Sequence, residues 1–177
     1  MAQALAGSQP AFEQILRRYQ RPILAFLARM TGDASLAEEL AQDTFVKAFR
    51  NLAAFDTTRR LSSWLFRIAH NTGIDALRKA RPPVVPIEDR EGDLDVAAPA
   101  SADPVERRAL GRALQAALAR LRPDHRAAVV LRYEDGMSFE EIGQVLGIPE
   151  VTARSHVHRA RKELARVMAA AGWAPDR

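Results

Sequence analysis

Apolar residues recur at spacings of three and four through most of this chain, which is the pattern of helices that bury one face. Strict alternation of apolar and polar residues, which indicates strands, never lasts beyond a few positions. Pro22 is expected to kink or split the first helix. Gly32 followed by Asp33 predicts the end of that helix and the start of the next one. The sequence therefore predicts an all-α protein. Its helices are expected at residues 10–30, 34–52, 62–79, 106–121, 124–134, 139–146 and 150–168.

The helical pattern stops at residues 81–105, which hold five of the ten prolines and no aromatic residue. This segment has a net charge of −4, whereas residues 1–80 and residues 106–177 each carry +4. Such a composition is typical of an extended, solvated tether. We therefore expect two small helical domains, 1–80 and 106–177, joined by a flexible, acidic, Pro-rich linker at 81–105.

Composition excludes several classes of protein. The chain of 177 residues has no cysteine, which rules out a disulfide framework, thiol catalysis and a cysteine-based metal site. It has no phosphate-binding GxxxxGK sequence and no HExxH sequence, so we expect no enzyme, no cofactor and no metal. No uncharged stretch approaches the length of about 18 residues that a membrane span needs, and no secretory leader is evident. A cytoplasmic protein without membrane insertion is the expectation.

The second domain contains the pattern of a helix-turn-helix. Ser138-Phe139-Glu140-Glu141 is a capping box, in which Ser138 caps the helix and Glu141 reaches back. Gly147 supplies a left-handed residue that ends this short helix, and Pro149 suits the entry to the next one. A short helix, a tight glycine turn and a second helix together form the motif.

The second helix of this motif divides into an apolar side and a cationic side at 100° per residue. Its apolar residues are Ala153, Val157, Ala160, Leu164, Val167 and Met168. In this motif the first turns enter the major groove, whereas cations further along hold phosphates. The predicted base-contacting residues are Thr152, Arg154, Ser155, His156 and His158, and the predicted phosphate-contacting residues are Arg159, Arg161 and Lys162. A solvated surface is the alternative interpretation. His156 and His158 lie on different faces, which disfavours a shared metal.

The helix at 34–52 has a wide apolar arc that the pattern predicts to be buried, from Leu36 through Phe45 and Phe49 to Leu52. The opposite arc places an apolar side chain among acids, an amide and a cation. Its members are Glu39, Gln42, Asp43, Val46 and Arg50. An arc of this kind suits either docking of a partner helix or plain exposure to solvent, and the pattern does not decide between them.

The helix at 62–79 carries a stripe of side chains suited to unstacked bases, because an aromatic ring can stack, an amide can contact a base edge and cations can hold the backbone. The stripe consists of Ser63, Trp64, Arg67, Asn71 and Arg78, and Arg59 and Arg60 in the preceding loop extend it. The alternative is that Trp64 belongs to the core.

Four segments occur in a set order along the chain. They are Leu36-Ala-Glu-Glu-Leu-Ala-Gln-Asp-Thr-Phe-Val-Lys-Ala-Phe49, then Trp64-Leu-Phe-Arg-Ile-Ala-His-Asn71 with Asp75 and Arg78, then Leu121-Arg-Pro-Asp-His-Arg126, and last Ser138-Phe-Glu-Glu-Ile-Gly143 with Thr152-Ala-Arg-Ser-His-Val-His-Arg-Ala-Arg161. In these segments the chain resembles the bacterial RNA polymerase sigma factors of the extracytoplasmic-function group.

The resemblance implies a function and partners. The first domain is similar to the family's region two, whose face at Glu39, Gln42, Asp43, Val46 and Arg50 would dock on the clamp coiled coil of the largest subunit of core RNA polymerase. Its loop and following helix would melt the promoter minus-ten element and trap a flipped base. The second domain is similar to region four, which would contact the minus-thirty-five element and the flap of the second-largest subunit. The linker would thread near the RNA exit path, and an anti-sigma protein is a further implied partner.

The sequence departs from the family pattern at the start of the last helix. The family usually has Gly where Val151 stands, Val where Ala153 stands and Arg where His156 stands, so an atypical minus-thirty-five preference is expected. Two other functions compete with the sigma-factor interpretation. One is a helix-turn-helix regulator with an N-terminal sensor or dimerisation domain, which would bind duplex DNA without polymerase. The other is an adaptor that binds proteins through both domains and has no affinity for DNA.

Overall fold

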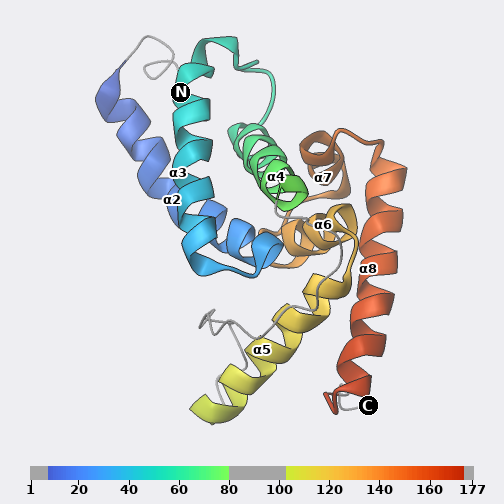
Figure 1. Cartoon of the computed structure of the whole chain (residues 1–177). Helices are drawn as coiled ribbons and strands as arrows, with labels where there is room; N and C mark the ends of the chain where they lie inside the picture. The colour runs from blue at the N-terminus through green and yellow to red at the C-terminus, as the bar shows by residue number, and fades with distance from the viewer. Residues whose placement is uncertain (1–7, 80–102, 174–177) are drawn as a thin grey trace.

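The computed structural model describes residues 8–79 and 103–173, and most of the predicted linker lies outside these ranges. The described residues form helices and no strands, which confirms the predicted all-α class. The elements are α2 (Gln9–Thr31), α3 (Ala34–Arg50), the short 3₁₀ helix η1 (Leu52–Ala54), α4 (Leu61–Lys79), α5 (Pro104–Arg120), α6 (Pro123–Tyr133), α7 (Phe139–Leu146) and α8 (Glu150–Ala170) (Figure 1). None of these helices is long and apolar enough to cross a bilayer.

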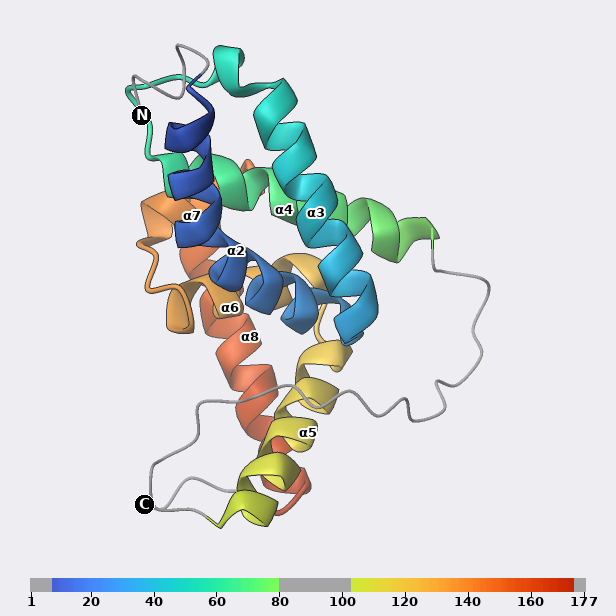
Figure 2. The ribbon, with the colours of Figure 1, turned by 90° about the vertical axis from the view of Figure 1, so that its left-hand side faces the viewer.

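Helix α2 remains one helix through Pro22 rather than splitting into two. Figure 2 shows that its two halves run in different directions, as expected where proline removes a backbone bond inside a helix. The helix ends at Gly32, whose φ of 75° lies in the left-handed region. Asp33 then caps α3 by accepting a bond of 3.0 Å from the backbone N–H of Leu36. The bend and the caps follow directly from the sequence.

The first half of the molecule packs α2, α3 and α4 against one another. Ile23, Phe26 and Leu27 of α2 are fully buried against Leu65 of α4, and the ring of Phe26 meets that of Phe66 edge-on at 5.4 Å. Burial of each such side chain contributes about 1.5–3 kcal/mol to folding. This packing holds the surfaces of α3 and α4 in fixed positions.

The second half contains the predicted helix-turn-helix. Ser138 Oγ accepts from the N–H of Glu141 at 3.1 Å, and the Glu141 carboxylate accepts from the N–H of Ser138 at 2.8 Å, so the capping box is present. Gly147 adopts a φ of 70°, and the N–H of Ile148 donates to the carbonyl of Gly143 at 3.0 Å. Helix α8 packs on α6 and α7 through its apolar side, where Ala153, Val157 and Ala160 are buried.

The turn of this motif depends on the missing side chain of Gly143. A Cβ at this position would lie 2.7 Å from the backbone carbonyl oxygen of Ile148, which cannot rotate away. We expect Gly143→Ala to lower the free energy of unfolding by about 2 kcal/mol, because overpacking forces the backbone to shift. Denaturant unfolding checks this value, with Gln144→Ala on the same helix as the control. Equal stability of the two variants, within 0.5 kcal/mol, would show that the turn tolerates a methyl group.

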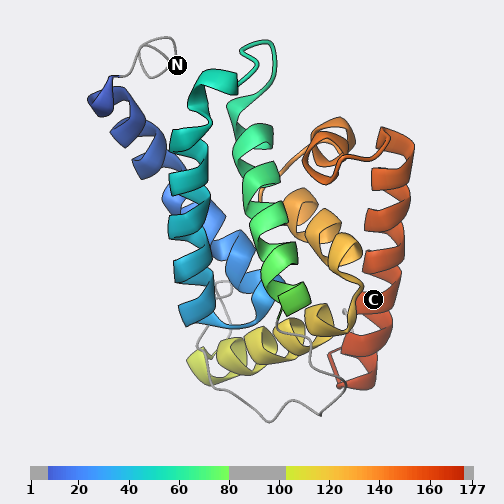
Figure 3. The same cartoon turned by 45° about the horizontal axis from the view of Figure 1, so that its top comes forward.

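The two halves contact each other through several helices. Helix α7 packs against α4, and the C-terminal end of α2 packs against α5 and α6 (Figures 2 and 3). The buried apolar residues of both halves form one continuous cluster. Helix α5 begins at Pro104, slightly earlier than the position 106 expected from the pattern, because Asp103 caps it by accepting from the N–H of Val105.

Candidate nucleic-acid interface

The cationic side of α8 faces solvent. Most of the predicted contact residues on this helix are exposed: Arg154, Ser155, His158, Arg159, Arg161 and Lys162. Thr152 is half-buried at the first turn. Glu163 lies outside this arc and pairs with Arg166 at 2.7 Å, and Glu150 pairs with Arg154 at 3.1 Å, which leaves Arg159, Arg161 and Lys162 available. The arrangement gives a helix with one face on the domain and an outward face that can meet a polyanion.

Arg154 is held in a defined place at the start of α8. Its guanidinium lies 5.0 Å from the ring centre of Phe139 and donates to the carboxylate of Glu150 at 3.1 Å. Arg132 stacks on the same ring at 4.8 Å. Cation–π contact at an exposed site contributes about 0.5–1 kcal/mol, which restrains a side chain that would otherwise sample many rotamers. The guanidinium is therefore partly ordered before any ligand arrives.

His156 differs from its predicted neighbours. Its ring is half-buried and lies 4.7 Å from the ring of His125 on α6, with Nδ1 buried and without a partner. Burial lowers the pKa of His156, and the nearby Arg159 and Arg122 lower it further against the opposing effect of Asp124. The structure thus places His156 against the domain rather than among the exposed side chains. Within the described ranges, no group of three or more acidic or histidine side chains is placed to hold a metal ion.

The stripe on α4 comes to the surface in part. Arg67, Asn71 and Arg78 are exposed, and Trp64 is half-buried with its ring 5.1 Å from that of Phe55. Ser63 is only 3% exposed and its Oγ has no partner, so the structure does not bring it to the surface with the others. A helical wheel places Ser63 beside Arg67, but it cannot show that a neighbouring element covers that edge.

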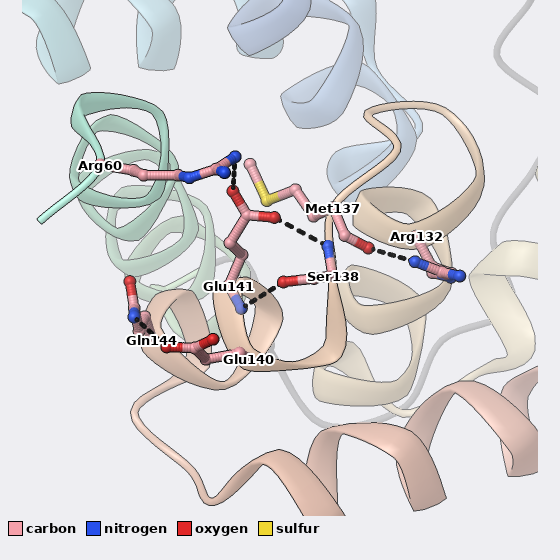
Figure 4. A network of polar contacts seen from close by, with 7 residues as sticks. All are labelled: Arg60, Arg132, Met137, Ser138, Glu140, Glu141 and Gln144. Atoms are coloured by element: carbon pink, nitrogen blue, oxygen red, sulfur yellow. Dashed lines mark hydrogen bonds and ion pairs between the residues drawn. The ribbon is translucent and has the colours of Figure 1, made fainter.

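The loop before α4 is ordered by its own polar side chains. Asp56 accepts from both the N–H and the hydroxyl of Thr58, and these bonds lower the pKa of the Asp56 carboxyl below its usual value. Arg59 lies 3.3 Å from the same carboxylate, whereas Arg60 reaches across to Glu141 of α7 at 2.8 Å (Figure 4). Both cations are exposed beside the stripe, as the sequence predicts.

A separate apolar groove of about 870 Å³ lies between α2 and α3. Val46 at 48% exposure and Phe49 at 60% exposure form one wall of it, with Phe12 of α2 in edge contact with Phe49 at 5.0 Å. The prediction that Phe49 is buried is therefore wrong. The apolar arc of α3 is wider than α2 and α4 can cover, so its last turn is left open.

The rim of the groove is polar. Gln42 and Arg50 line it, whereas Glu39 and Asp43 are exposed on the neighbouring face of α3. Sequence reasoning found the polar residues and Val46 but missed the apolar contribution of α2. The signal in the sequence was the spacing of Phe12 and Leu16, which lie one helical turn apart; the structure adds that neither is fully buried.

Comparison with known proteins shows which family contains this fold. The sigma-70 region 2 family matches residues 15–82, and the sigma-70 region 4 family matches residues 111–164. The chain is 43% identical over 159 residues to the RNA polymerase sigma factor CarQ of Myxococcus xanthus, covering 89% of both chains. The protein belongs to the extracytoplasmic-function sigma factors. It is also 34% identical over 170 residues to SigW of Bacillus subtilis, covering 92% of this chain and 91% of that one.

Two solved structures share the fold. CnrH, solved in complex with the cytosolic domain of CnrY, is 31% identical and has a TM-score of 0.72, covering 96% of this chain and 94% of CnrH. RpoE of Bartonella quintana, solved with the anti-sigma factor NepR, is 26% identical with a TM-score of 0.69, covering 90% and 97%. As a sigma factor the protein directs transcription initiation, and the alternative of a regulator with a sensor domain is not favoured.

Proposed function

We propose that this sigma factor divides its work between two domains, 1–80 and 106–177, joined by the segment 81–105. The exposed stripe of α4 would bind the unstacked minus-ten strand through Arg59, Arg60, Trp64, Arg67, Asn71 and Arg78. The outward face of α8 would contact the minus-thirty-five element through Thr152, Arg154, Ser155, His158, Arg159, Arg161 and Lys162. The observation that carries this proposal is the pair of exposed cationic helix faces on α4 and α8, which one continuous packed core holds in place.

The groove between α2 and α3 is the proposed docking site for core RNA polymerase. A partner helix with one apolar face fits this groove, because apolar grooves bind amphipathic helices through a few anchoring side chains. The exposed Phe49 and Val46 supply the anchors, together with the half-buried Phe12. Polar contacts around them come from Gln42, Arg50, Glu39 and Asp43. Docking is favoured over plain exposure to solvent because the ring of Phe49 is 60% exposed. Folding of the chain alone leaves this aromatic ring in water.

The free energy for promoter opening has to come from binding. Stacking one base on an aromatic side chain contributes about 1–3 kcal/mol, whereas flipping a base costs a few kcal/mol. The two quantities nearly cancel, so the sigma factor alone should not open duplex DNA and polymerase supplies the remainder. We infer no catalytic step in this chain and a cytoplasmic location. We also infer regulation by an anti-sigma protein, since RpoE was solved with the anti-sigma factor NepR.

Asn71 provides a direct test of the minus-ten surface. We expect Asn71→Ala to lower promoter opening by the holoenzyme about fivefold, since it removes one net hydrogen bond of about 1 kcal/mol to an unstacked base. Affinity for core polymerase should stay within twofold. Permanganate reactivity of unpaired thymines measures opening, and Asn51→Ala, at the exposed C-cap of α3, is the matched control. Equal opening by both variants would remove Asn71 from the surface.

A further inference from the structure

Val151, the second residue of α8, exposes its side chain to solvent although it is apolar. Its exposure of 69% equals that of Val105 on α5 and exceeds that of Phe49 in the groove. A single exposed apolar residue is ordinary on a protein surface and by itself indicates nothing. The position of Val151 on its helix is what makes it informative.

Val151 lies near the middle of the outward, cationic face of α8. At about 100° per residue its neighbours on the helix surface are polar or cationic and all exposed: Arg154, Ser155, His158 and Lys162. Figures 1 and 3 show α8 along one edge of the molecule, with α6 and α7 on its inner side. The face that has Val151 near its middle is therefore the face proposed to contact the minus-thirty-five element.

Folding of the chain does not account for a valine at this position. The buried contacts of α8 come from Ala153, Val157 and Ala160 on the opposite side of the helix. The first turn is closed by its backbone, since the N–H groups of Thr152 and Ala153 both donate to the carbonyl of Pro149 at 3.0 Å. Valine is also a poorer helix former than alanine. The valine side chain thus contributes little to the stability of this helix.

The side chain of Val151 is restrained before any ligand arrives. A β-branched residue in a helix strongly prefers one χ1 rotamer, so both methyl groups point in a defined direction. One turn along, the Oγ of Ser155 donates to the carbonyl of Val151 at 3.1 Å, which turns the hydroxyl proton toward the helix. Val151 therefore presents a small, rigid apolar surface beside a hydroxyl oxygen that can still accept a hydrogen bond.

Duplex DNA offers one apolar group in the major groove, the 5-methyl group of thymine. The other base edges present hydrogen-bond donors or acceptors, which an apolar side chain would cover without replacing their bonds to water. A phosphate would gain nothing from the valine either, since phosphates are bound by cations and polar groups. In a helix-turn-helix the first turns of the second helix reach the base edges. The DNA group that fits Val151 is therefore a thymine methyl group.

We infer that Val151 is a specificity-determining residue, which contacts the 5-methyl group of one thymine in the minus-thirty-five element. This contact rests on the proposed function of α8 and adds an apolar base contact to the polar ones assigned there. Arg154 lies three residues further along the same face, a rise of about 4.5 Å, whereas one base-pair step is about 3.4 Å. The thymine should therefore lie within about two base pairs of the position that Arg154 contacts.

Replacement of thymine by deoxyuridine is the direct test, because deoxyuridine forms the same base pair and lacks only the 5-methyl group. The probe is a duplex promoter fragment from a transcript start that depends on this chain, with deoxyuridine at one minus-thirty-five thymine at a time. Binding of the holoenzyme should weaken about fourfold at one thymine, the effect of removing one buried methyl group. Val151→Ala holoenzyme should bind the unmodified fragment more weakly by a similar factor and show no further loss with deoxyuridine at that thymine.

Val105→Ala is the matched control, since Val105 is also the second residue of its helix and is equally exposed. Its holoenzyme should keep the affinity and the deoxyuridine response of the unaltered chain. Val151 would not contact a thymine methyl group if no single deoxyuridine weakened binding, or if the same one weakened binding equally in the unaltered and Val151→Ala holoenzymes. Failure of the proposed function is distinct, because randomising the whole minus-thirty-five element would then leave holoenzyme binding unchanged.

Discussion

Replacing Val46 by glutamate should reduce affinity for core RNA polymerase at least 100-fold. The valine side chain is 48% exposed on the groove between α2 and α3, and docking would remove it from water. A carboxylate in its place would be buried without a partner, which costs about 3 kcal/mol or more, and each 1.4 kcal/mol is a factor of ten. Fluorescence anisotropy of labelled sigma factor titrated with core polymerase measures the dissociation constant.

The matched control for this change is Val105→Glu. Val105 is 69% exposed near the start of α5, away from the groove, and the same substitution there should leave polymerase affinity within twofold. Thermal unfolding should be nearly unchanged for both variants, since neither valine belongs to the core. If Val46→Glu bound polymerase as tightly as Val105→Glu, the docking site would have to lie elsewhere.

Replacing Arg154 by alanine should lower transcription from a minus-thirty-five-dependent promoter by about 10- to 100-fold. Arginine recognises a base edge through two parallel bonds, which contribute about 1–3 kcal/mol of discrimination. Phe139 and Glu150 already restrain the guanidinium, so little ordering cost remains when DNA binds. The loss should be concentrated at one base pair of the element, and a library of promoters with every base at each position measures it.

Arg166→Ala separates loss of a base contact from loss of positive charge. Arg166 is exposed on the same helix but pairs with Glu163 at 2.7 Å, beyond the turns that enter the groove. Its removal should weaken binding slightly and uniformly across the library, as expected when a phosphate contact is lost. If Arg154→Ala weakened binding uniformly across the library and by the same amount as Arg166→Ala, Arg154 would contact the DNA backbone rather than a base.

The fold follows from local patterns to a large extent. Every predicted helix exists, because each carries its own apolar face, and several carry a start or stop residue, as Asp33, Ser138 and Gly147 illustrate. The outward placement of Val46 and the cationic side of α8 were also predictable, since a helical wheel depends only on spacing. The spacing of residues on one helix does not show how much of its surface the neighbouring elements cover. The exposure of Phe49 and the burial of Ser63 were therefore not predicted.

Contacts between distant segments were outside the reach of the pattern. Arg126 is a charged residue in a helix, and nothing in the sequence indicates that its guanidinium is buried against two helix ends. His156 was expected to face DNA, yet the adjacent ring of His125 withdraws it into the domain. The ion pair between Arg29 and Glu134 joins residues that are 105 positions apart and separated by a segment with no helical pattern.

The most direct test of two-site promoter recognition is run-off transcription with purified core polymerase on sheared genomic DNA, with sequencing of the transcript starts. We expect discrete starts that depend on this chain, each preceded by two shared elements at a constant spacing. Asn71→Ala should reduce all of them, whereas Arg154→Ala should reduce those that match the minus-thirty-five element. Starts that are the same without the chain, or that share only one element, would contradict two-site promoter recognition.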